Sequence, residues 1–181
     1  MKKHLFLLAL IVGLASSLSA RADFYAGVGF GMGFNDGSST KAGVRSEYKD
    51  SPVYSLAGGY QWPLPLLDIR GEVEYLHLRP DLKDGRTKQL DGAFVNAYGT
   101  IPLVPFIDPY VGLGIGRVRY DHDNAFAIQG MLGAEYSLPF LPDLSVGAEY
   151  RYLKVNETTG KARAPSKFHT NILMLKARYM F

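Results

Sequence analysis

The chain has 181 residues, which is enough for one domain but too few for two domains with separate cores. It holds 20 basic and 17 acidic residues and no cysteine, which excludes a disulfide framework and chemistry at a thiolate. Tyrosine, phenylalanine and glycine are abundant, and the mean hydropathy of the chain is near zero. A membrane protein with so low a mean hydropathy must cross the membrane with strands rather than with helices.

The first 22 residues predict a cleaved signal peptide. Lys2 and Lys3 give a positive start, residues 5–15 are apolar, and Ala20-Arg21-Ala22 supplies small residues for cleavage. We place the cut after Ala22, with Ala20 as the alternative. A membrane-spanning helix would need about 20 apolar residues, and glycine and serine interrupt this run too early.

The predicted cleavage also changes the charge balance. It removes three basic residues and no acidic residue, so the mature chain is formally neutral. The basic character of the precursor is therefore no argument for nucleic-acid binding, and we expect no nucleic-acid partner.

From residue 23 onward, apolar residues alternate with small or polar ones. In residues 23–34 the even positions are all apolar and the odd positions are mostly glycine, a pattern that a strand separates onto two faces. The same alternation recurs at about 53–62, 67–78, 90–101, 109–120, 125–138, 144–155 and 169–181. These eight strands are each long enough for a tilted crossing of a bilayer, and bacterial single-chain barrels have an even number of strands.

The connections between these strands alternate in length. Short proline-rich turns are predicted at 63–66, 102–107 and 139–142. Longer hydrophilic connections are predicted at 35–52, 79–89 and 156–168, with a shorter one at 121–124. Short turns at one rim and longer loops at the other are typical of an outer-membrane barrel, whose short turns face the periplasm.

The alternation also fits a soluble, lipocalin-like barrel with its apolar face inside. Aromatic residues near the strand ends favour the membrane barrel, because they match its aromatic girdles. The less apolar face carries charges that sum to zero: Arg70, Glu72, Glu74, Glu135, Glu149, Arg151, Lys176 and Arg178. We therefore predict a network of paired charges inside the barrel that closes it, with a narrow gated pore as the alternative.

Arg117 and Arg119 do not fit this assignment, because they share the apolar face of their strand. Two explanations are open. The arginines lie near the outer rim and meet lipid phosphates, or a bulge shifts the register of the strand.

The last strand carries alternating apolar residues, an aromatic residue two positions from the end and a terminal phenylalanine. It resembles the C-terminal signal that the outer-membrane assembly machinery recognises, here Leu173, Leu175, Ala177, Tyr179 and Phe181. Residues 109–116 and 146–152 resemble the outer-membrane-protein β-barrel family, which includes opacity-type and Omp25/31-like surface proteins and is similar to the eight-stranded barrel of OmpA.

The alternation and the resemblance together predict an all-β fold, an eight-stranded antiparallel transmembrane up-and-down β-barrel over residues 23–181, preceded by a signal peptide over residues 1–22. The resemblance implies an integral protein of the cell outer membrane. Its expected partners are outer-membrane lipid, lipopolysaccharide and the assembly machinery.

The sequence contains few candidates for catalytic groups. Only His77, His122 and His169 in the mature chain offer an imidazole, and no serine–histidine–acid pattern accompanies them. Asp121-His122-Asp123 is more typical of a solvated turn than of a metal site. We therefore predict no catalytic, cofactor-binding or metal-binding residue and no enzyme.

The leading hypothesis is a structural or surface-contact protein whose loops meet host or cell-surface ligands. The connection 35–52 carries charges of both signs, including Lys41, Arg45 and Glu47, and is the best candidate for such contact. The alternatives are a small porin-like channel and a lipid-modifying enzyme of the outer membrane.

Overall fold

The computed structural model describes residues 23–34, 38–39, 45–46, 51–64, 67–78, 90–101, 106–120, 123–156 and 168–181. The predicted signal peptide lies outside these residues, as do the connection 79–89 and most of the connections 35–52 and 156–168. None of the described residues forms a helix long and apolar enough to cross a membrane.

Eight long strands build the molecule, in agreement with the prediction. They are β1 (Asp23–Phe34), β4 (Ser51–Trp62), β5 (Asp68–Leu78), β6 (Leu90–Thr100), β7 (Ile107–Tyr120), β8 (Asp123–Leu138), β9 (Leu141–Val155) and β10 (Phe168–Met180). Several strands begin a few residues earlier than the alternation predicted. Pro52, Pro109 and Pro142 lie within the first three residues of β4, β7 and β9, where a missing N–H disturbs the ladder least.

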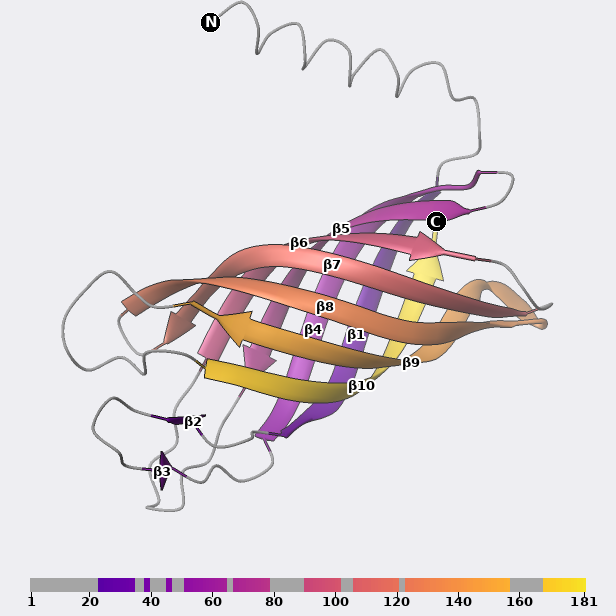
Figure 1. Cartoon of the computed structure of the whole chain (residues 1–181). Helices are drawn as coiled ribbons and strands as arrows, with labels where there is room; N and C mark the ends of the chain where they lie inside the picture. Colours follow the sequence, from indigo (N-terminus) through magenta and orange to yellow (C-terminus); the bar gives the residue numbers. More distant parts are fainter. Residues whose placement is uncertain are drawn as a thin grey trace, which may run out of the picture.

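The strands form one closed antiparallel barrel in the order β1-β10-β9-β8-β7-β6-β5-β4 (Figure 1). β1 pairs with β10 along most of its length, from Tyr25 opposite Met180 to Phe34 opposite Asn171. This pairing leaves no sheet edge to template association with another chain. The only register shift in the described barrel pairs lies between Ser137 and Leu138 in β8.

The barrel has two different ends. The connections 35–50, 79–89, 121–122 and 156–167 all leave one end, which we call the loop end. The connections after β4, β6 and β8 leave the other end, which we call the turn end, and β1 starts and β10 finishes there (Figure 1). Within the first long connection, β2 (Ser38–Ser39) pairs with β3 (Arg45–Ser46).

The outward face is apolar over most of its area, as the alternation predicted. Outward positions along β1 are exposed, while the glycines between them are buried. At the turn end, aromatic rings meet edge to face: Tyr60 contacts Phe24 and Trp62 at centroid distances of 4.8 and 4.6 Å, and Tyr179 contacts Phe181 at 5.2 Å. Such rings are typical of the interfacial girdles of a transmembrane barrel.

The inward face is divided into two layers along the barrel axis. Toward the turn end it is polar and charged. Toward the loop end it is an apolar cluster of Val53, Leu76, Leu78, Leu90, Phe94, Val118, Ala127, Leu153, Ile172 and Met174. The charge network inside the barrel was predicted from the sequence, but the apolar layer was not. The two layers follow from the local sequence of the strands. In β5, for example, the inward residues change from Arg70, Glu72 and Glu74 to Leu76 and Leu78 toward the loop end.

Candidate functional site

The eight charged residues predicted to face inward all lie inside the barrel, where they form two clusters. The first cluster joins three strands near the turn end. Arg70 on β5 donates from Nη1 to both carboxylate oxygens of Glu135 on β8, at 2.8 and 2.9 Å. Arg178 on β10 donates from Nη2 to the same carboxylate at 2.5 Å and from Nη1 to Gln61 Oε1 at 2.5 Å. Two guanidinium groups thus share one carboxylate, which leaves this cluster with one excess positive charge.

The second cluster lies closer to the apolar layer and centres on Arg151. Its guanidinium forms a bidentate pair with Glu74, two N–H···O contacts of 2.9 Å, and reaches Glu149 Oε1 at 2.6 Å. Lys176 lies 3.3 Å from Glu149 and 3.9 Å from Glu72. Two cations meet three carboxylates here, so this cluster carries one excess negative charge that balances the first.

Neutral side chains connect the two clusters, and the sequence analysis did not identify them as part of the network. Tyr25 and Tyr98 donate from their hydroxyls to the two oxygens of Glu72, each at 3.0 Å. The ring of Tyr98 also lies beneath the Arg70 guanidinium, 4.9 Å from its centroid. Asn96 donates to Glu74 at 2.9 Å and accepts from Gln129 at 2.7 Å. Their inward parity, which they share with the buried charges of other strands, was the signal that could have identified them.

The network fills its part of the lumen. Arg151, Glu149 and Glu74 have side chains that are 0% exposed, although they carry charge. Isolated charges at such sites would be prohibitively costly, and here each one has opposite charges and hydrogen bonds within contact distance. Above them the apolar layer is equally closed, since Leu76 and Phe94 are buried almost completely.

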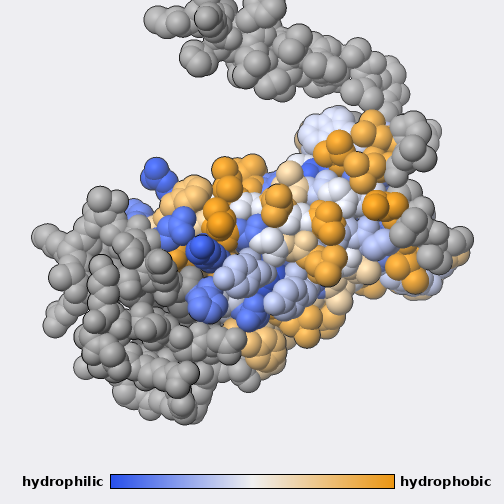
Figure 2. Space-filling model, viewed as in Figure 1, coloured by the Kyte–Doolittle hydropathy of each residue, from blue (hydrophilic) through white to orange (hydrophobic). Residues whose placement is uncertain are grey.

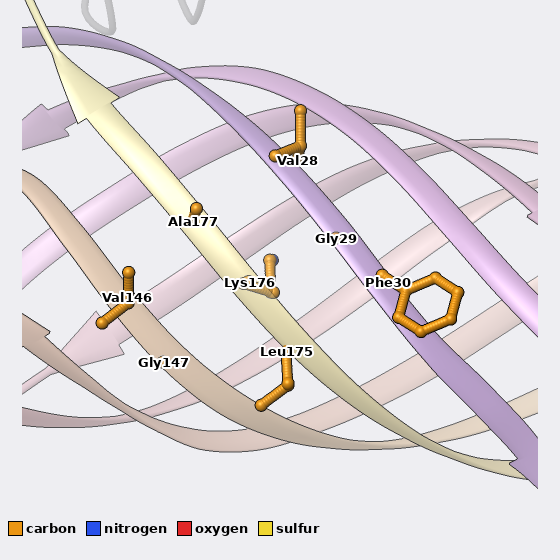
Figure 3. Close-up of a pocket in the computed structure, with 8 residues that line it drawn as sticks. All are labelled: Val28, Gly29, Phe30, Val146, Gly147, Leu175, Lys176 and Ala177. Atoms are coloured by element: carbon orange, nitrogen blue, oxygen red, sulfur yellow. The ribbon is translucent and has the colours of Figure 1, made fainter.

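Two outward depressions offer shallow sites on the barrel wall. One has a volume of about 600 Å³ and lies over the β9, β10 and β1 strands, where Ala177 is flanked by Val28, Val146 and Leu175 (Figure 3). The other has a volume of about 750 Å³ and lies over β5 to β9 above Ala97, Gly99 and Gly130. Both are lined mainly by apolar side chains and glycines, and neither lining includes a serine, histidine or carboxylate.

The structure places His77 beside an acid that the sequence analysis did not pair with it. His77 Nδ1 lies 2.6 Å from Asp91 Oδ1, and the Tyr75 hydroxyl donates to the same oxygen at 2.6 Å. The outward residue opposite His77 on β4 is Tyr54. The second imidazole, His169, lies on β10 with its ring 6.2 Å from that of Tyr152, and His122 lies outside the described residues.

Arg117 and Arg119 both lie on the outward face near the loop end of β7, and both are exposed. Their strand pairs without a register shift along its whole contact with β6 and β8. The bulge that was one explanation for these residues is therefore excluded, and the arginines face the membrane side of the barrel.

The five residues of the predicted assembly signal end up on or beyond the outward side of β10. Leu173, Leu175 and Tyr179 are exposed, Ala177 is half-buried, and Phe181 follows the strand with 77% of its surface exposed. The backbone N–H of Phe181 donates to the Phe24 carbonyl at 2.9 Å, which continues the closing seam by one residue. Recognition of these residues by the assembly machinery stays a prediction.

Solved structures with the same fold come from several outer-membrane proteins. Neisserial surface protein A has a TM-score of 0.60 and 16% identity, over 88% of this chain and 99% of that chain. OprG from Pseudomonas aeruginosa has a TM-score of 0.53 and 15% identity, over 88% and 96%. The outer membrane enzyme PagL has a TM-score of 0.54 and 13% identity, over 84% and 97%. At these identities the likeness shows the fold alone.

The comparison of sequences is more specific. No curated protein matches the chain as a relative. Residues 5–181 match the family of the outer membrane protein beta-barrel domain, and this match agrees with the closed eight-stranded barrel and its apolar outer face. The family and the solved structures indicate that the protein is located in the outer membrane. The chain therefore belongs to the outer membrane protein beta-barrel domain family.

Proposed function

We propose that the protein is a closed membrane anchor without catalytic activity, whose loop end contacts molecules outside the cell. The observation that carries this proposal is the filled lumen. A network of paired charges occupies the turn-end half, and the apolar cluster around Phe94 and Leu76 occupies the loop-end half. An eight-stranded barrel has room for little beyond its own side chains, so this filling favours a plug over a pore.

The outward surface supports the same proposal. The two depressions on the barrel wall are lined mainly by apolar residues. His77 and Asp91 form an acid–imidazole pair, and the outward neighbours named for it among the described residues, Tyr54 and Tyr75, are phenols rather than the serine of a hydrolytic triad. With the lumen filled, the loop end is the part of the molecule that presents long polar connections to an external partner.

A conductance measurement tests the closed lumen. Protein reconstituted in planar bilayers should give no stepwise current, and Glu72→Gln should stay silent because the apolar layer remains in place. A wide porin reconstituted in the same way shows that open channels are detected. Reproducible steps in the unmodified protein, with a size that changes in Glu72→Gln, would establish the porin-like alternative instead.

An attachment assay tests the contact role. Residues 38–46 are replaced by a glycine–serine segment of equal length, and the matched control replaces residues 80–88 in the second long connection. Cells that express the unmodified protein should attach to cultured host cells more than cells with an empty vector, and the first replacement should abolish the gain. Equal attachment with and without the protein would refute the contact role, and loss only in the control would refute its assignment to the first connection.

The lipid-modifying alternative has a separate test. Mass spectra of lipid A from cells with and without the protein should be identical. A new deacylated or otherwise modified species that disappears in His77→Asn would show that the His77–Asp91 pair is catalytic.

A further inference from the structure

The charges on the outward face are strongly asymmetric. Six residues at outward positions of the described barrel strands have acidic, basic or imidazole side chains: His77, Asp91, Arg117, Arg119, Lys154 and His169. Each of these six residues lies within four residues of the loop end of its strand. Apart from Asp143, which is exposed as the third residue of β9, exposed positions in the turn-end half of the described strands hold no such residue. In Figure 2, the most hydrophilic residues on the visible face accordingly lie mainly toward the left, which is the loop end in Figure 1.

Arg117 and Arg119 are the centre of this outward charge. They are two residues apart on β7, so both side chains leave the same side of the strand. Among the described residues, neither guanidinium forms an ion pair within 4.0 Å. Arg119 lies opposite Asp91, but that carboxylate is already held by Tyr75 and His77. Two arginines beside one carboxylate leave a net positive charge at this point of the outward face.

The cost of arginine on a lipid-facing surface is high at the bilayer midplane and small near the interface. At the loop end, which faces outward when the short turns face the periplasm, the two guanidinium groups reach the headgroup level of the outer leaflet. A guanidinium binds a phosphate through two parallel N–H···O bonds, so phosphate is the ligand that this chemistry favours.

An apolar groove lies on the membrane side of these arginines, with the outward residue Ile115 between the groove and Arg117. Ala97, Leu113, Gly130 and Tyr152 follow one another across β6, β7, β8 and β9 in a single row of paired residues. Because Gly130 has no side chain, this row is depressed between Leu113 and Tyr152, and it forms part of the depression of about 750 Å³. Arg117 follows Leu113 by four residues, or about 13 Å along the strand.

Lys154 completes the loop-end border of the groove. It follows the groove residue Tyr152 by two positions, and its side chain is exposed on the outward face of β9. Through Ile128, Lys154 lies in the same row as Ile115, two residues before Arg117, so Lys154 and Arg117 stand about 12 Å apart across the barrel wall. Basic groups border the groove at the headgroup level, and apolar residues line it toward the membrane centre.

We propose that this surface, formed by Arg117, Arg119, Lys154 and the groove over Gly130, binds a phosphorylated glycolipid of the outer leaflet. The guanidinium groups hold a headgroup phosphate, and an acyl chain lies in the groove. The proposal does not depend on the contact role of the loops, because every residue that carries it belongs to a barrel strand.

The binding experiment uses the full barrel refolded in detergent, with lipid binding followed by native mass spectrometry. The probes are bisphosphorylated lipid A and the same lipid after removal of its phosphates. Arg117→Gln with Arg119→Gln should weaken binding of the phosphorylated lipid by about tenfold for each lost charge-assisted contact. The same variant should leave binding of the dephosphorylated lipid unchanged. Equal binding of both lipids by the unmodified barrel, or no loss in the double variant, would overturn the proposal.

A second pair of variants tests the groove. Gly130→Leu fills it and should weaken binding of both lipids, and a Cβ added at Gly130 meets no atom closer than 4.0 Å, so we expect the barrel to fold. Ala134→Leu, at another exposed outward position of β8, is the matched control and should bind like the unmodified protein. Unfolded barrels are recognised by loss of heat-modifiable migration. Displacement of bound lipid A by millimolar inorganic phosphate alone would show a free-anion site and overturn the assignment to lipid.

Discussion

Arg151 shows how a full charge can lie at the centre of this barrel. Its side chain is 0% exposed, and its guanidinium donates to Glu74 and Glu149. Burying these groups is costly, and their mutual attraction offsets that cost only because the fork of the guanidinium matches the two carboxylates. The arrangement is consequently sensitive to the loss of a single partner.

Replacing Arg151 alone should destabilise the barrel strongly. In Arg151→Met the buried carboxylates of Glu74 and Glu149 lose their main partner, so we expect the free energy of unfolding to fall by about 3–5 kcal/mol. Urea titration of the barrel in lipid vesicles, followed by tryptophan fluorescence of Trp62, measures this change.

Two controls distinguish the effect of breaking the charge network from the effect of removing any arginine. Arg117→Met removes an exposed arginine near the interface and should change the free energy of unfolding by no more than about 1 kcal/mol. Arg151→Met combined with Glu74→Gln and Glu149→Gln removes the unpaired charges and should recover much of the lost stability. A triple variant as unstable as the single one would show that packing, not charge, dominates at this site.

At the scale of strands, inward glycines provide the space in which aromatic rings of neighbouring strands lie. A Cβ atom added at Gly112 on β7 would lie 2.4 Å from Cδ1 of Tyr98 on β6, and one added at Gly133 would lie 2.5 Å from the ring of Tyr110. These rings in turn contact the guanidinium of Arg70, each with its centroid at 4.9 Å. The close approach of glycine backbone and ring therefore positions part of the charge network.

Gly112→Ala should displace the Tyr98 ring and weaken its contacts with Arg70 and Glu72. Overpacking of this kind typically costs about 1–3 kcal/mol, which the same urea titration can measure. Gly130→Ala is the matched control, because the nearest atom to its added Cβ is 4.0 Å away, and it should leave stability unchanged. Equal stability of the two variants would mean that the Tyr98 ring adapts at no cost.

At the scale of the whole molecule, the assembly signal and the stability of the finished barrel can be separated. Phe181 is 77% exposed and Phe140 is 75% exposed, and both lie at the turn end of the barrel. Neither ring is buried in the folded barrel, so replacement of either should change its stability little. Only Phe181 belongs to the predicted C-terminal signal.

Phe181→Ala should therefore lower the amount of heat-modifiable barrel in the outer membrane of cells, while the same variant refolds in detergent as well as the unmodified protein. Phe140→Ala should reach the outer membrane normally. A loss of folded barrel that is equal for both variants in cells would contradict a specific role for the terminal phenylalanine in assembly.

The sequence by itself determined the number of strands, their approximate bounds and the direction of each side chain. Period-two alternation is a local property of the backbone, so the strands β1 and β5 and their two faces could be predicted without knowing which strands they pair with. It also placed Arg70 and Arg151 on the inward face and Arg117 on the outward face.

Only the tertiary structure decided which inward residues meet and at what level of the barrel. Arg151 and Glu74 are 77 positions apart in sequence, and their contact depends on register, strand tilt and closure, none of which a local pattern contains. The same is true of the apolar layer around Phe94 and of the regular register that places Arg117 and Arg119 above the groove at Gly130. Alternation gives each side chain a face, and pairing between distant strands gives it neighbours.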